Sequence, residues 1–144
     1  MKKIKFAIAI PTYNRIDKLK KTLNSVFSQK ISEKFELSVV ISNSASTDGT
    51  YEYLKKIKNK NFFIYNRKEI IDENQISQFV NFDNLAKTIP ENIDWVWWIG
   101  DDDHFASSDS IEYVVQKIIK YKNSKINFIH ACQAQRFSGK SEDF

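Results

Sequence analysis

Three adjacent carboxylates are the strongest candidate for chemistry in this sequence. Asp101, Asp102 and Asp103 follow Gly100 and an apolar run at residues 95–99. Like charges about 4 Å apart cost roughly 4 kcal/mol at an effective dielectric of ~20, so a bound cation would relieve their repulsion. Hard oxygen ligands suit Mg²⁺ or Mn²⁺ that bridges to substrate phosphates. A solvated acidic turn before a helix is the alternative, and residue types alone favour neither interpretation.

Two other polar segments also follow apolar runs. Residues 11–15 follow the run at 6–10 and offer a tyrosine ring, an amide and a guanidinium able to bind phosphate. Residues 46–50 follow the run at 37–41. Each segment is also typical of an ordinary turn between a strand and a helix, with Asn14 or Asp48 as the cap. The chain has no Gly-rich phosphate loop and no Walker lysine, so nucleotide binding of those kinds is not indicated.

The elements that must position these segments are strands alternating with helices. Short apolar runs predict strands at residues 6–10, 37–41, 62–65, 95–99 and 126–129. Apolar residues at helical spacing predict four helices between them, with these inward residues: Leu19, Leu23, Val26 and Phe27; Tyr51, Leu54 and Ile57; Ile76, Phe79, Val80 and Leu85; Ile111, Val114, Val115, Ile118 and Ile119. Asp109 and Glu112 predict a capping box for the last helix.

This alternation predicts an α/β fold, with an open, mostly parallel sheet and helices on both of its faces. Residues 1–144 fit a single domain, because domains are typically about 100–150 residues long. In such sheets ligands bind beyond the carboxyl ends of the strands. We therefore expect the site among residues 11–15, 42–49, 66–74 and 100–104.

Composition limits the partners and the compartment. The net charge is +4, but the lysines are scattered over helix-like stretches, which indicates a solvated outer face rather than a nucleic-acid surface. The single cysteine, Cys132, excludes an internal disulfide and a Cys-rich zinc site and favours a reducing compartment. No apolar run approaches the ~18 residues of a membrane span. We expect a cytoplasmic protein, either free or peripheral to the inner face of the membrane.

The order of the polar segments resembles that of the family-2 glycosyltransferases. The sequence reads AIPTYNR at the first strand end, then ISNSASTDGT, then NFDNLA, then WWIGDDD. The resemblance runs from Lys5 to Ile129. It implies a GT-A fold, a nucleotide-sugar donor, Mn²⁺ or Mg²⁺ as cofactor, and sugar transfer to a hydroxyl with inversion. A UDP-sugar is the first choice of donor, a glycan or lipid-linked glycan is the acceptor, and surface polysaccharide or glycolipid synthesis is the setting.

The resemblance also implies roles for the first two segments. Pro11, Thr12 and Tyr13 would border the nucleotide base. Arg15 would lie near the phosphates, and Asp48 would support the base-binding loop. These residues therefore form the expected nucleotide site.

For the acidic segment the resemblance implies a metal site. Asp101 would touch the ribose or belong to the metal's shell. Asp102 would be the first choice of direct ligand, and Asp103 is a further candidate. Which of the three acids ligates stays open.

Asn43 is a departure from the family pattern. Family members usually have an acid at this position to read the edge of the base, whereas this chain has Asn43 between Ser42 and Ser44. A carboxylate only accepts hydrogen bonds, while an amide both donates and accepts them. We therefore expect an unusual or relaxed base preference.

A second departure concerns the catalytic base. In the family a carboxylate of the acceptor half, well beyond the metal motif, deprotonates the acceptor hydroxyl, and this chain ends at Phe144. We expect an N-terminal nucleotide-binding portion that does not transfer sugar alone, with its base beyond residue 144. Two alternatives remain: a non-catalytic nucleotide-sugar-binding module, and a nucleotidyltransferase, which would need a Gly-rich basic loop after the first strand.

Overall fold

The computed structural model describes residues 2–69, 78–123 and 129. Within them four strands form one sheet: β1 (Ile4–Thr12), β2 (Phe35–Ser44), β3 (Phe62–Arg67) and β4 (Trp95–Trp98). Their order is β3-β2-β1-β4, and every neighbouring pair is parallel. The strand predicted at residues 126–129 lies, apart from Ile129, outside the described residues. The predicted parallel α/β sheet is confirmed.

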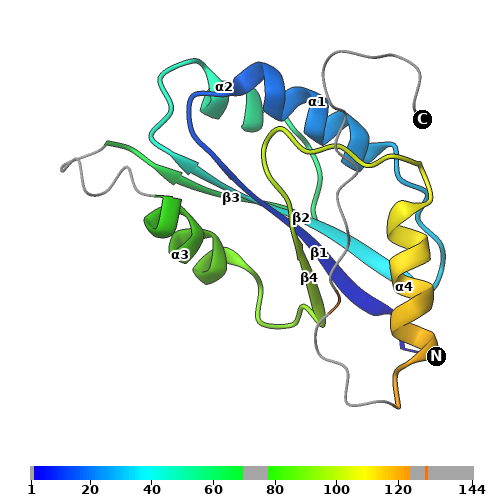
Figure 1. Cartoon of the computed structure of the whole chain (residues 1–144). Coiled ribbons are helices and arrows are strands. Elements are labelled where there is room, and N and C mark those ends of the chain that lie inside the picture. Colours follow the sequence, from blue (N-terminus) through cyan, green and yellow to red (C-terminus); the bar gives the residue numbers. More distant parts are fainter. Residues whose placement is uncertain (1, 70–77, 124–128, 130–144) are drawn as a thin grey trace.

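Helices cover both faces of this sheet, as predicted (Figure 1). The helices α1 (Ile16–Phe27), α2 (Thr50–Leu54) and α4 (Ser110–Lys120) contribute buried residues to one core cluster, whereas α3 (Gln78–Thr88) packs on the opposite face. Residues of β1 alternate between the two faces: Phe6 and Ile8 point to the larger cluster and Ala7 and Ala9 to α3. No helix of the described ranges combines the length and the apolar character needed to cross a bilayer.

The strand β1 is longer than the sequence predicts. It continues through Pro11 to Thr12, and Pro11 lies opposite Ser42 of β2. The Ala9 carbonyl accepts a hydrogen bond from the Ile99 amide, so β1 directs the backbone groups of residues 9 and 11 toward β4. Because β4 ends at Trp98, no strand partner is lost where Pro11 lacks an N–H.

The helix α3 differs from its predicted inward face. Phe79, predicted to face inward, is 84% exposed, whereas Asn81 and Leu85 are buried. The predicted inward residue Ile76 lies outside the described residues. The prediction for Phe79 is wrong because a polar residue, Asn81, takes the inward position and forms hydrogen bonds there.

Two smaller predictions about helices also need correction. The helix α2 ends at Leu54, so Ile57 follows it, although Ile57 still packs against the core. The inward face of α4 is confirmed, but its capping box does not form. The Asp109 carboxylate accepts from the Ser107 hydroxyl, and the Glu112 carboxylate accepts from Lys34 and Gln116. The Ser107 hydroxyl engages the Asp109 carboxylate, which therefore does not cap the backbone amides at the start of α4.

Candidate functional site

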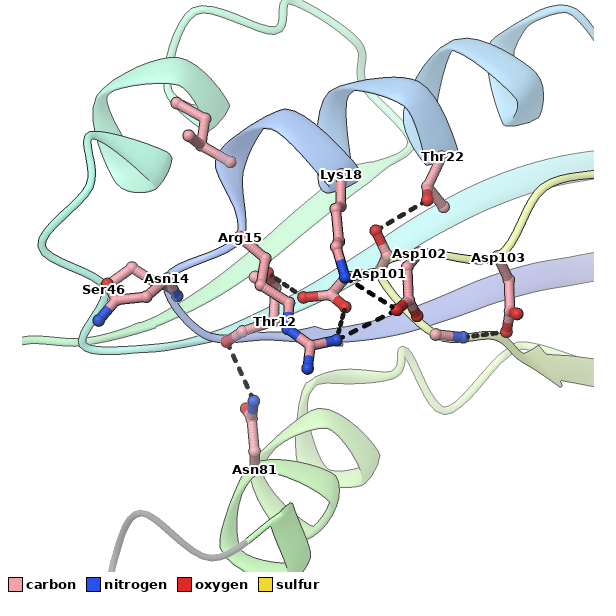
Figure 2. A network of polar contacts seen from close by, with 12 residues as sticks. Thr12, Asn14, Arg15, Lys18, Thr22, Ser46, Asn81, Asp101, Asp102 and Asp103 are labelled. Carbon is pink, nitrogen blue, oxygen red and sulfur yellow. Dashed lines mark hydrogen bonds and ion pairs between the residues drawn. The ribbon is translucent and has the colours of Figure 1, made fainter. Parts of the chain in front are cut away.

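The carboxyl ends of the parallel strands meet at one edge of the sheet, where the predicted site segments come together (Figure 2). Two polar groups of residues lie there. The first is the charged cluster, which consists of Arg15, Lys18, Asp101, Asp102 and Asp103. The second joins the ends of β1, β2 and β3 through neutral side chains.

Asp101 is the buried centre of the charged cluster and is 5% exposed. The Thr12 hydroxyl donates to its Oδ2 at 2.8 Å, and Arg15 Nη1 lies 3.2 Å from its Oδ1. The Thr22 hydroxyl, on the inward face of α1, donates to the Asp101 carbonyl at 2.9 Å. Because both carboxylate oxygens and the carbonyl have protein donors, the position of Asp101 is fixed by β1 and α1.

Asp102 is placed differently, because its side chain is 48% exposed. Its Oδ2 lies 3.3 Å from Arg15 Nη1 and 3.4 Å from Lys18 Nζ. Charge-assisted hydrogen bonds between nitrogen and a carboxylate are usually about 2.7–2.9 Å long, so these contacts are long ones. Both cations are half-exposed as well. Asp102 is therefore the acid of the triplet whose partners a ligand can most easily replace.

Asp103 folds back on its own loop. Its Oδ2 accepts from the Gly100 amide at 2.7 Å. A Cβ atom at residue 100 would lie 3.1 Å from Asp102 Oδ1 and from Asp103 Oδ2. Gly100 thus gives the acidic side chains room to turn toward the backbone, which a larger residue would remove.

Asp101 and Asp102 share the Arg15 guanidinium, which reduces their repulsion, whereas Asp103 turns to the Gly100 amide. Over the described ranges 2–69, 78–123 and 129, no three His, Cys, Asp or Glu side chains gather closely enough to hold a metal ion. Any divalent cation here would take several of its ligands from a substrate diphosphate and from water, which is the usual coordination of Mg²⁺. The oxygen-only donors fit such a shared ion, with Asp102 as the accessible carboxylate.

Neutral side chains join the other strand ends, and we call Asn14, Asn43, Ser46 and Asn66 the amide clasp. Asn43 is buried; its Nδ2 donates to Asn66 Oδ1 at 2.7 Å, and its Oδ1 accepts from the Ser46 hydroxyl at 2.5 Å. The backbone N–H of Asn14 donates to the Ser46 hydroxyl at 2.8 Å. Asn14 (φ 50°) has a left-handed backbone, which asparagine tolerates better than most residues. Asn43, predicted to read the base, thus has both ends of its amide engaged within the protein.

Asp48 links the starts of two helices. Its Oδ2 accepts from the Ile16 amide of α1 at 2.8 Å, and its Oδ1 accepts from the hydroxyl and amide of Thr50 in α2. Burial raises the pKa of Asp48, but the hydrogen bonds from Thr50 and Ile16 outweigh it and lower the pKa below its ordinary value. The structure therefore gives Asp48 a capping function, which is compatible with its expected support of the loop.

Three residues of this edge were not predicted: Lys18, Thr22 and Asn81. The Asn81 amide donates to the Thr12 carbonyl at 3.1 Å, and its Oδ1 accepts from the Ser42 hydroxyl. A polar residue within an otherwise apolar helix face is the signal that could have identified Thr22, which lies between Leu19 and Leu23.

Of the predicted residues, Tyr13 is 38% exposed and Pro11 lies within β1.

Comparisons with known proteins agree with this fold. Residues 7–142 match the family described as Glycosyl transferase family 2. The abequosyltransferase RfbV of Salmonella typhimurium is 37% identical to this chain over 102 residues. The structure of S. aureus TarS 1–349 in complex with UDP superposes with a TM-score of 0.69 at 22% identity, over 83% of this chain. A mannosyltransferase of Pyrobaculum calidifontis, solved with GDP-Man and Mn²⁺, gives a TM-score of 0.64 at 18% identity, over 81% of this chain.

The chain spans only part of these proteins. The match covers 69% of this chain but 28% of the abequosyltransferase. It covers 33% of the TarS fragment and 33% of the mannosyltransferase. At these identities the two solved structures support the GT-A fold, and the family match rests on the sequence.

Proposed function

The chain belongs to glycosyl transferase family 2, and from this membership we propose that its charged cluster binds the diphosphate of a nucleotide sugar together with Mn²⁺ or Mg²⁺. The observation that carries the proposal is the placement of Arg15 and Lys18 against the half-exposed Asp102. Two cations and an accessible carboxylate at the carboxyl edge of a parallel sheet are suited to a phosphate and a metal ion.

Each side chain of the cluster has a distinct part in this proposal. Arg15 and Lys18 exchange their long contacts with Asp102 for phosphate oxygens. The Asp102 carboxylate then becomes available to the divalent metal ion, while the buried Asp101 carboxylate keeps Arg15 in position. When bound, the cation supplies charge neutralisation for the departing diphosphate.

The nucleoside lies, in this proposal, beside Tyr13 and the backbone of Pro11 and Thr12. The exposed Tyr13 ring offers a surface for the base. A UDP-sugar is the first choice of donor. The complexes of TarS with UDP and of the mannosyltransferase with GDP-Man and Mn²⁺ support the donor class and the metal without fixing the base.

For the whole protein we propose transfer of a sugar to a hydroxyl with inversion, in surface polysaccharide or glycolipid synthesis. The likeness to an abequosyltransferase supports a sugar transferase. A nucleotidyltransferase is less well supported, because residues 11–15 contain no glycine and one basic residue. A binding module without turnover is distinguished by product analysis: it would bind the donor and never release the free diphosphate.

We further propose that this chain does not catalyse the transfer alone, because its described acids after the triplet are poor bases. Asp109 and Glu112 are these acids in residues 104–123 and 129. The Ser32 hydroxyl and the Lys34 ammonium hold the pKa of Glu112 at about 2. The Lys34 carbonyl also accepts a hydrogen bond from the Ile4 amide at the amino end of β1, so Glu112 lies at the opposite edge of the sheet. Glu142 and Asp143 lie outside the described residues.

Calorimetric titration with UDP, in Mn²⁺ and in a chelator, tests the proposed binding. We expect tighter binding in Mn²⁺, and loss of that difference in Asp102→Asn, which keeps the size of the side chain. Asp17→Asn is the matched control, since Asp17 lies on α1 with its side chain 88% exposed and pairs with Lys20. Equal UDP affinities in Mn²⁺ and chelator for the wild type would refute the metal-dependent site.

A further inference from the structure

An exposed pair of aromatic rings lies on the α3 face of the sheet, at the carboxyl end of β4. Phe82 of α3 and Trp98 of β4 are each 40% exposed, and their ring centroids lie 5.6 Å apart at an interplanar angle of 44°. Neither ring belongs to the core clusters of the described residues. The neighbouring Trp97, by contrast, packs against the core and contacts Phe105. Within residues 2–69, 78–123 and 129, the pair is thus not part of the core packing of the sheet.

Backbone connections tie both rings to the proposed donor site. Trp98 is the last residue of β4, opposite Ala9, and the acidic loop begins two residues later at Gly100. Phe82 follows Asn81, whose amide donates to the Thr12 carbonyl. Thr12 in turn donates to Asp101. The two residues are therefore linked to the charged cluster through the chain at Gly100 and through the hydrogen bonds of Asn81 and Thr12.

We propose that Phe82 and Trp98 form an aromatic platform on which a hexose ring of the substrate stacks. This inference rests on the proposed function. A pyranose has one face of C–H groups that packs on an aromatic ring, and hydroxyls at its rim that need polar neighbours. Ligand sites commonly combine apolar and aromatic walls with a few polar groups. Here the platform supplies the apolar wall and the acidic loop supplies the polar groups.

A sugar fits this surface better than a protein partner does. Stable protein interfaces bury about 800 Å² on each partner, which is far more than two half-exposed rings offer. A small ligand that joins an apolar face to polar groups matches both the size and the surroundings of the pair. The sugar is either that of the donor or that of the acceptor, and the experiment separates these sources.

Trp98→Leu and Phe82→Leu remove the ring faces while keeping apolar side chains. Tyr113→Leu is the matched control, because Tyr113 is 61% exposed on α4, outside the platform. Affinities for UDP, UDP-glucose, UDP-N-acetylglucosamine and GDP-mannose are measured in Mn²⁺ by calorimetry. Amide spectra are recorded with methyl glycosides of glucose, galactose and mannose, and the indole signal of Trp98 is assigned by its loss in Trp98→Leu.

If the donor sugar stacks here, both platform variants weaken a UDP-sugar or GDP-mannose by about three- to tenfold while UDP itself is unchanged. If the acceptor sugar stacks here, donor affinities stay constant, and the methyl glycosides shift the Trp98 indole signal in the wild type and lose that affinity in Phe82→Leu. Tyr113→Leu matches the wild type in both cases.

Unchanged affinities for every nucleotide sugar, together with no glycoside-induced shift at Trp98, would overturn the platform. So would self-association of the wild type in sedimentation that Trp98→Leu abolishes without a change in sugar affinity. Failure of the wild type to bind UDP at all would instead remove the proposed function, and this inference with it.

Discussion

The amide clasp and the charged cluster lie at the same edge of the sheet but are built differently. In the clasp, Asn14, Asn43, Ser46 and Asn66 are joined by contacts of 2.5–2.8 Å. In the cluster, Asp102 meets its cations only at 3.3 and 3.4 Å, with all three side chains about half-exposed. The short contacts around the buried Asn43 fix the shape of this edge of the sheet. The long, exposed contacts of Asp102 instead allow its carboxylate and the two cations to exchange partners.

The same difference exists inside the charged cluster. Asp101 resembles the clasp, because it is buried and its oxygens are occupied by Thr12 and Arg15. Asp102 is the exchangeable member. Two adjacent residues of the same type thus separate into a structural acid and a candidate ligand-binding acid, and this separation can be tested by their effects on stability.

The largest expected effect is on the stability of Asp101→Ala. This substitution removes the acceptor of the buried Thr12 hydroxyl, and we expect the free energy of unfolding to fall by about 2 kcal/mol. Asp102→Ala should change it by less than ~0.5 kcal/mol, because exposed ion pairs contribute little. Urea denaturation followed by circular dichroism measures both. Equal losses in the two variants would contradict the division of the cluster.

A smaller effect is expected for Asp48→Ala, which removes the shared acceptor at the starts of α1 and α2. Loss of such a cap typically lowers the free energy of unfolding by ~1 kcal/mol. Because the folded-state pKa of Asp48 is below its ordinary value of 3.8, the wild-type advantage is present above that pH and is lost as the pH falls further. Denaturation of both proteins between pH 7 and pH 3 checks this. An advantage that persists unchanged at the lowest pH would show that the carboxylate charge is not involved.

The sequence was sufficient to predict the sheet, the helices on both faces and the family. These predictions rest on long-range regularities, namely apolar runs that alternate with helical patterns and polar segments in a fixed order. Predictions from these two regularities stay correct even where the bounds of one element are wrong, as for β1, which extends through Pro11 to Thr12.

Local polar contacts were not predictable in the same way. Phe79 was expected inside and is exposed because Asn81 takes the inward place, and nothing in the helical pattern ranks an amide above a phenyl ring. The predicted cap between Asp109 and Glu112 is replaced by contacts to Ser107 and Lys34. Such partners are brought together by the fold, so spacing along the chain does not reveal them. The predicted roles of the site residues remain predictions.

A base-reading role for the clasp is tested by Asn43→Asp. The Asn66 amide can rotate to donate to the new carboxylate, so the fold should be retained. An acceptor-only side chain should change the affinity for at least one of UDP, dTDP, GDP and CDP by about three- to fivefold, and so alter their ranking. Asn92→Asp introduces the same charge at an exposed position outside the edge and serves as the control. Unaltered ranking and affinity would mean that the clasp only shapes the edge.

The smallest expected effect concerns Lys18, the outer cation of the charged cluster. Its side chain is 57% exposed and its contact with Asp102 is long, so Lys18→Gln should leave the stability unchanged. An exposed charge acts on a phosphate mainly through a screened attraction, and the screening length is about 10 Å at 0.1 M salt. We therefore expect Lys18→Gln to weaken UDP binding by about threefold at low salt and by less at high salt. Lys20→Gln is the control, because Lys20 lies on the same helix and pairs with Asp17 instead. UDP titrations at 0.05 and 0.5 M NaCl separate the outcomes. If both variants lose the same affinity, the net charge of α1 attracts the nucleotide rather than the placement of Lys18, and the exchange of partners at Asp102 then involves Arg15 alone.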